Sequence, residues 1–162
     1  MQSNHIIEII KKRTSVRNYA EELLSDEILT EILQAGLYAP SGKNRKPWRF
    51  AVIKDKTILN ELSNLTVYSR FIRHAPVLIL LYSLQTNDYP IEKDILSIGA
   101  CMQNILLAAT EYGYGTCVIG EFFGKEKTVN KITSIEFSNT TLLYGITLGK
   151  PNTQINRNNE EK

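Results

Sequence analysis

One segment near the middle of the chain is apolar on every side of the helix that it would form. The run from Ile98 to Ala109 has ten apolar or small residues among twelve, and it belongs to a predicted helix from Pro90 to about Tyr112. A helix that is apolar all round must be covered all round. Either a second copy of the chain covers it, or the other elements of the same chain do. We expect a second copy, because so short a chain has few elements to spare.

The length of 162 residues fits a single domain spanning 1–162, with a polar tail over 151–162. Helix and strand patterns alternate along the chain without an internal repeat. Helices are predicted over about 6–13, 25–40, 55–65, 90–112 and 125–132, and strands over about 48–54, 76–82, 116–119 and 141–148.

Composition argues against several classes of protein. The net charge is only +2 and the basic residues are dispersed, which disfavours nucleic-acid binding. The longest apolar run, Ala75 to Tyr82, is too short to cross a bilayer. The amino terminus has no leader pattern, so we expect a cytoplasmic protein without a membrane partner. Cys101 and Cys117 lie far apart without a histidine cluster, and this predicts buried thiols and no metal site.

Two arginines and a serine recur at every second position after the first helix. If the segment from Thr14 to Tyr19 is extended, Arg13, Ser15 and Arg17 point to one side. Two guanidinium groups and a hydroxyl on one side suit a phosphate, because arginine donates paired, charged hydrogen bonds. The alternative is a solvated basic stretch that pairs with the glutamates following it.

The loop APSGKNRKPW, over 39–48, joins a helix to a strand and is the most informative segment of the chain. Its prolines, glycine, serine and asparagine indicate a shaped backbone. Asn44 can both donate and accept hydrogen bonds, which suits a ring edge with a carbonyl beside an N–H. Taken alone, the loop could equally be an ordinary turn.

Four segments together resemble the FMN-dependent nitroreductase family in order and spacing. They are RTSVRNY (13–19), APSGKNRKPW, the long helix with Asp94, Gly99 and Asn104, and GYGTCVIGEF (113–122). The resemblance runs from about residue 5 to about residue 150, and its specific part is PSGxN followed by PW. One departure is Lys46, where many members have glutamine, so one polar contact near the flavin edge is expected to differ.

The resemblance implies an α+β sandwich, with a mixed central sheet packed by helices and two subunits interlocked as a homodimer. FMN would lie between the subunits, near Arg70 and a basic residue of the tail, for which Arg157 is preferred over Lys150. The other flavin contacts implied by the resemblance are Arg13, Thr14, Ser15 and Arg17 from one subunit, Pro40, Ser41, Gly42 and Asn44 from the other, and Ile119, Gly120 and Glu121 beside the reactive N5.

The resemblance also implies an oxidoreductase that uses NAD(P)H to reduce nitroaromatics, quinones or similar electron-poor small molecules by a ping-pong mechanism. The flavin carries the chemistry and no side chain is expected to act as acid or base. A cation near N1 favours the reduced flavin, and Arg17 is the candidate. Two alternatives remain: a flavin-binding carrier or sensor with little turnover, and a flavin dehydrogenase or dehalogenase of the same fold.

Overall fold

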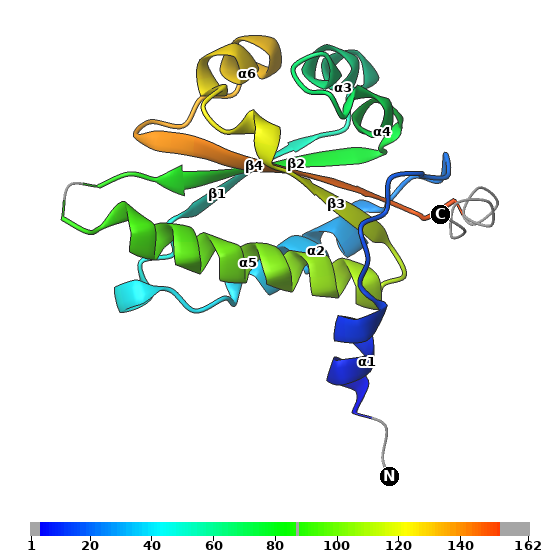
Figure 1. Ribbon diagram of the computed structural model, residues 1–162, viewed down its shortest axis with the longest axis horizontal. Coiled ribbons are helices and arrows are strands. Elements are labelled where there is room, and N and C mark those ends of the chain that lie inside the picture. Colours follow the sequence, from blue (N-terminus) through cyan, green and yellow to red (C-terminus); the bar gives the residue numbers. More distant parts are fainter. Residues whose placement is uncertain (1–3, 87, 153–162) are drawn as a thin grey trace.

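In the computed structural model, which describes residues 4–86 and 88–152, two layers of helices enclose a four-stranded sheet (Figure 1). The strands are β1 (Trp48–Ile53), β2 (Val77–Leu84), β3 (Gly115–Ile119) and β4 (Thr140–Gly149), in the order β1-β2-β4-β3. All three pairings are antiparallel, and the parallel component among the described residues is an isolated bridge between Ser15 and Thr116. The predicted α+β class is therefore confirmed.

Alternation along β2 divides the core between the two faces of the sheet. This strand is buried along nearly its whole length, so residues that point in opposite directions both need an apolar layer. Leu78, Leu80 and Tyr82 pack into the cluster on one face, and Val77, Ile79 and Leu81 into the cluster on the other.

Helices cover both faces of the sheet. On one face lie α3 (Lys56–Ser63), α4 (Ser69–His74) and α6 (Glu126–Thr133), and on the other lie α2 (Asp26–Leu37) and α5 (Ile91–Glu111) (Figure 1). The helix α1 (His5–Lys12) projects from the body beside the end of α5 and has no buried residue. Two short 3₁₀ turns, η1 (Gly42–Asn44) and η2 (Gly120–Phe122), complete the described elements.

The predicted helices and strands are all present, with ends shifted by a few residues. Ser25 caps α2 as its position predicts, since its Oγ accepts a hydrogen bond from the Ile28 N–H at 3.3 Å. The sequence pattern did not reveal α4, whose six residues bury only Phe71 and Ile72 and are too few for a clear helical period.

The described chain covers α5 on one side only. Its inner side packs on α2 and the sheet, with Ile98, Cys101 and Ile105 fully buried. On the outer side Leu96, near the start of α5, is 75% exposed, and α1, beside the other end of α5, exposes Ile6 to 68%. Between residues 98 and 109 the outward apolar and small residues are half-buried, so the described chain does not enclose this helix completely, and a second copy remains the prediction for its outer side. Over the same residues, no helix is both long and apolar enough to span a membrane.

Candidate functional site

The first predicted motif lies along the free edge of β3. The Val16 N–H donates to the carbonyl of Thr116 at 2.9 Å, next to the bridge formed by Ser15. Tyr19 anchors the far end of the segment: its hydroxyl donates to the Val16 carbonyl at 2.6 Å and lies 2.7 Å from Oγ1 of Thr147. These contacts hold the segment extended, as the β-branched residues predicted.

The side chains of Ser15 and Arg17 share one side of this segment and both approach Cys117. Burial raises the pKa of the Cys117 thiol, while the nearby Arg17 guanidinium and Ser15 hydroxyl act in the opposite direction. Within the described residues, neither Arg13 nor Arg17 forms a salt bridge, so the expected alternative of pairing with the neighbouring glutamates is not seen. The two guanidinium groups remain available to an anion.

A shallow groove lies beside this segment, with a volume of about 180 Å³. Thr14 lines it together with Thr110, Gly113 and Tyr114 from the end of α5 and the turn that follows. The Lys150 ammonium lies over the Tyr114 ring, 4.8 Å from its centroid. Lys150 is therefore a described basic residue near this groove, whereas the preferred candidate, Arg157, lies outside the described residues.

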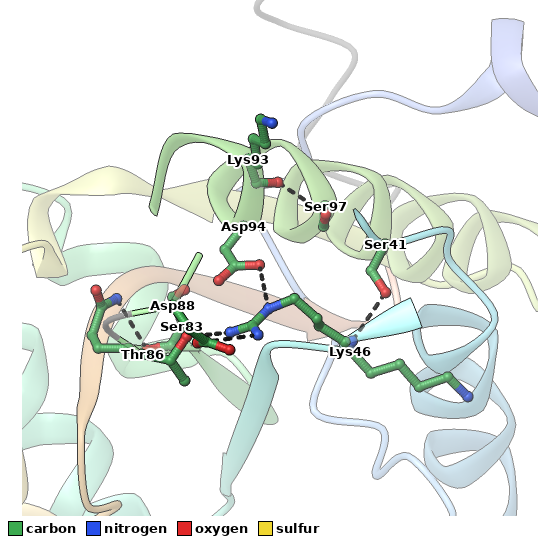
Figure 2. A network of polar contacts seen from close by, with 10 residues as sticks. Ser41, Lys46, Ser83, Thr86, Asp88, Lys93, Asp94 and Ser97 are labelled. Carbon is green, nitrogen blue, oxygen red and sulfur yellow. Dashed lines mark hydrogen bonds and ion pairs between the residues drawn. The ribbon is translucent and has the colours of Figure 1, made fainter. Parts of the chain in front are cut away.

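The second motif forms a loop whose backbone is left-handed at three positions. Lys43, Asn44 and Lys46 have φ of 53°, 54° and 51°. The Oγ of Ser41 accepts a hydrogen bond from the Lys46 N–H at 2.9 Å and closes the loop (Figure 2). Asn44 is exposed, and so its amide can meet a ligand. The shaped backbone predicted from the sequence is confirmed.

Within one subunit, the two motifs lie at opposite ends of α5. The loop over 40–46 contacts the first turn of α5 through Asp94, while Thr14 lines a groove with Thr110 near the end of the helix. Because α5 has 21 residues, these ends are separated by about 30 Å. The structure therefore does not bring the two predicted groups of flavin contacts together in one copy of the chain.

The third motif, the turn at Ile119–Glu121, is tied to the segment that precedes α4. The carboxylate of Glu121 accepts a hydrogen bond from the Val67 N–H at 2.9 Å. Lys125 Nζ contacts the carbonyl of Leu65, which adds a second link between the two segments. Arg70 is exposed in the first turn of α4, three residues beyond Val67. The turn and Arg70 thus belong to one region of the surface.

The sequence alone did not identify two polar contacts around these motifs. One is the Glu121 carboxylate on Val67, and the other is the contact of Arg45 with Asp94. Each partner is distant in sequence, so no local pattern could reveal the pair. Over the described ranges, no three His, Cys, Asp or Glu side chains are grouped as metal ligands would be.

The chain is similar in sequence to known proteins over most of its length. The sequence profile of the nitroreductase family matches residues 10–67 and 61–150. A protein of Archaeoglobus fulgidus, provisionally named NADH dehydrogenase/NAD(P)H nitroreductase, is 29% identical over 148 residues, which cover 90% of this chain and 84% of that protein. The iodotyrosine deiodinase of Thermotoga neapolitana is 28% identical, with 77% of this chain and 80% of its own length covered.

A solved structure shares the fold closely. A provisionally named nitroreductase of Desulfovibrio desulfuricans, crystallised in complex with FMN, has a TM-score of 0.86 and 34% sequence identity. The alignment covers 93% of this chain and 88% of that protein. The similarity therefore extends over both helical layers and the sheet.

Proposed function

This chain belongs to the nitroreductase family, and we propose that it binds FMN between two copies of itself and uses NAD(P)H to reduce electron-poor small molecules. It is an FMN-dependent NAD(P)H oxidoreductase, in agreement with the FMN complex of one structural neighbour and the name of the Archaeoglobus relative. The observation that carries the proposal is that the two motifs expected to bind the flavin lie near opposite ends of α5.

The residues beside β3 suit the phosphate end of FMN. Arg13 and Ser15 would face the phosphate, and Arg17, which like Arg13 has no carboxylate partner in the described chain, would lie toward the ribityl chain and the ring. Charged hydrogen bonds from guanidinium groups to phosphate are short and strong. Lys150 lies close enough to the neighbouring groove to contribute a further positive charge.

We infer a second copy because the two motifs, which contact α5 at Asp94 and Thr110, lie about 24 Å apart along that helix within one copy. A homodimer would place the loop over 40–46 of one copy beside the β3 edge of the other. Two groups of exposed apolar side chains, one near each end of α5, are suited to such an interface, because burying apolar surface against a partner is favourable. They are Ile6, Ile7 and Ile10 on α1 and Ile91, Ile95 and Leu96 on α5.

When bound, FMN supplies the redox chemistry, taking a hydride from NAD(P)H and passing two electrons to the acceptor. The side chains bind, orient and tune the flavin. Arg17 would favour the reduced form if its positive charge lies toward the ring, and the start of the η2 turn, at Gly120 and Glu121, would offer backbone N–H groups that lack partners within the turn. Donor and acceptor use the same open face in succession, which predicts ping-pong kinetics.

The acceptor is the part of the function on which relatives differ. We propose nitroaromatics and quinones as the acceptor class. The similarity to an iodotyrosine deiodinase favours a second candidate, the reductive removal of a halide from a halogenated phenol. A flavin carrier with little turnover would share every flavin-binding residue and differ only in its reaction with substrates.

Rapid mixing of the protein with its substrates tests these functions. Purified protein is loaded with FMN and mixed anaerobically with NADH or NADPH, and the flavin absorbance is followed. Fast bleaching, then recovery on adding a nitroaromatic or a quinone, is the expected result. Recovery only with iodotyrosine would assign the dehalogenase function. Persistent colour with both donors would contradict the proposed enzyme, and protein that takes up no FMN would contradict the proposal altogether.

A further inference from the structure

Arg45 lies inside the second motif and is half-buried, whereas the neighbouring Asn44 is exposed. Its Nε is 3.7 Å from Oδ1 of Asp94 on α5, and its Nη1 is 3.5 Å from Oδ1 of Asp88 (Figure 2). Its Nη2 also contacts the hydroxyl of Thr86. The side chain is 18% exposed and that of Asp94 only 3%, so this pair lies mostly beneath the surface.

Tyr89 connects the guanidinium group to the glycine of the same loop. The Tyr89 ring centroid lies 4.7 Å from Cζ of Arg45, within the range of a cation–π contact. A Cβ atom on Gly42 would lie 1.8 Å from the Tyr89 hydroxyl oxygen, so only glycine allows the ring to sit this close. Arg45 and Gly42 are therefore held by the same segment, just before α5.

The loop needs such support because its backbone is strained. Left-handed φ values at residues other than glycine cost about 1–3 kcal/mol each and persist only where the surroundings enforce them. The backbone of Arg45 has a right-handed conformation, with φ of −70°, between Asn44 and Lys46, whose backbones are left-handed. It is thus the residue through which this strained segment is attached to the long helix.

The pairing also explains why a carboxylate is buried at the start of α5. A buried charge is tolerated when an opposite charge accompanies it, and the first turn of a helix favours a negative one. Asp94 lies in this first turn, and its salt bridge among the described residues is to Arg45. Removing Arg45 would leave the Asp94 charge buried without its salt bridge, whereas removing Asp94 would leave Arg45 only its pair with the exposed Asp88.

We propose that Arg45 is a positioning residue for flavin binding: its ion pair with Asp94 holds the loop over 40–46 in the shape in which Ser41, Gly42 and Asn44 meet FMN. This inference rests on the proposed function, because it assumes that the loop binds the flavin. Arg45 itself makes no contact with the flavin in this arrangement. It acts by keeping the loop attached to α5, at the end opposite to the β3 edge.

The test is a double-mutant cycle read out by FMN affinity. Apoprotein of the wild type, Arg45→Ala, Asp94→Asn and the double variant is titrated with FMN at one protein concentration, and quenching of flavin fluorescence gives Kd. Each single variant is expected to raise Kd about tenfold, which corresponds to about 1.4 kcal/mol. The double variant should be no weaker than the worse single variant, because the two residues act as one unit.

Two further measurements separate positioning from general destabilisation. Visible circular dichroism at saturating FMN should change in Arg45→Ala, because the loop shapes the environment of the ring. Lys54→Ala is the matched control, since it removes an exposed ion pair, with Asp26, distant from the loop. It should leave both Kd and the flavin spectrum unchanged. Arg45→Lys keeps the charge but replaces the planar guanidinium group with a single nitrogen. Its Kd for FMN should lie between those of the wild type and Arg45→Ala.

Arg45→Ala with wild-type Kd and wild-type dichroism would overturn the positioning role while leaving the proposed function intact. If Arg45→Ala does not fold, wild-type Kd and wild-type dichroism in Arg45→Lys would overturn the positioning role instead. Additive effects of Arg45→Ala and Asp94→Asn would also contradict a coupled pair. A wild-type protein that binds no FMN would instead refute the proposed function, so the two failures are distinguishable.

Discussion

The carboxylate of Glu121 accepts a hydrogen bond at 2.9 Å from the backbone N–H of Val67, which is 54 residues away in the chain. This contact fastens the η2 turn to the segment before α4. That segment ends in Val67, 80% exposed, and Tyr68, 42% exposed, beside the turn expected to face the flavin N5. We infer that Glu121 acts through its side chain as well as its backbone, by holding in place the exposed segment at Val67 and Tyr68, which we expect to border the acceptor.

Removal of this carboxylate should therefore weaken acceptor binding. We predict that Glu121→Ala raises the KM for the acceptor about tenfold, because a hydrogen bond to a charged group contributes about 1.5–3 kcal/mol. Glu121→Gln keeps an oxygen that can accept from Val67 and should retain most of the affinity. Steady-state kinetics with a quinone measure both. Equal effects of the two substitutions would show that the contact with Val67 is not the cause.

Arg17 should set the redox potential of the bound flavin. A unit charge at about 4 Å contributes at most about 4 kcal/mol at an effective dielectric of 20, and roughly 1–3 kcal/mol after screening. Because the charge stabilises the reduced form, Arg17→Ala should lower the two-electron midpoint by roughly 20–65 mV. Potentiometric titration of the loaded protein measures the shift. Arg13→Ala is the control, and it should weaken FMN binding while shifting the midpoint potential less than Arg17→Ala does. An unchanged midpoint potential in Arg17→Ala would contradict the electronic role of Arg17.

The exposed apolar residues of α1 and α5 should hold two copies together. We predict that Leu96→Glu yields a monomer that binds FMN at least tenfold more weakly, because a buried charge without a partner opposes association. Light scattering coupled to size-exclusion chromatography gives the mass, and fluorescence titration gives the affinity. Lys131→Glu on α6, on the other side of the sheet, should leave the dimer intact. Monomers that retain full FMN affinity would contradict a site shared between subunits.

Gly36 allows α2 to approach α5 closely. A Cβ atom there would lie 2.8 Å from Cγ1 of Ile105 and 3.1 Å from the sulfur of Cys101, both fully buried. Alanine gains roughly 1 kcal/mol of helix propensity but overpacks the core at a cost of about 1–3 kcal/mol. We expect the cost of overpacking to exceed the gain in helix propensity, so Gly36→Ala should lower the free energy of unfolding by about 1–2 kcal/mol.

Urea denaturation at fixed protein and FMN concentrations measures this loss. Gln34→Ala, at an exposed position of the same helix, serves as the control and should change the free energy of unfolding by less than about 0.5 kcal/mol. A more stable Gly36→Ala protein would mean that the two helices move apart without penalty.

Local sequence was enough to predict the four strands, every helix except α4, the motifs and the all-round apolar character of the central helix. These follow from local periodicity and from residue types with narrow chemistry, such as the arginines beside Ser15 or the turn residues around Asn44. The tertiary structure alone decided that the two motifs lie at opposite ends of α5, that Arg45 pairs with Asp94, and that Glu121 holds Val67. Such partners are chosen by how helices and strands pack across the domain, and packing brings together residues that no spacing along the chain relates.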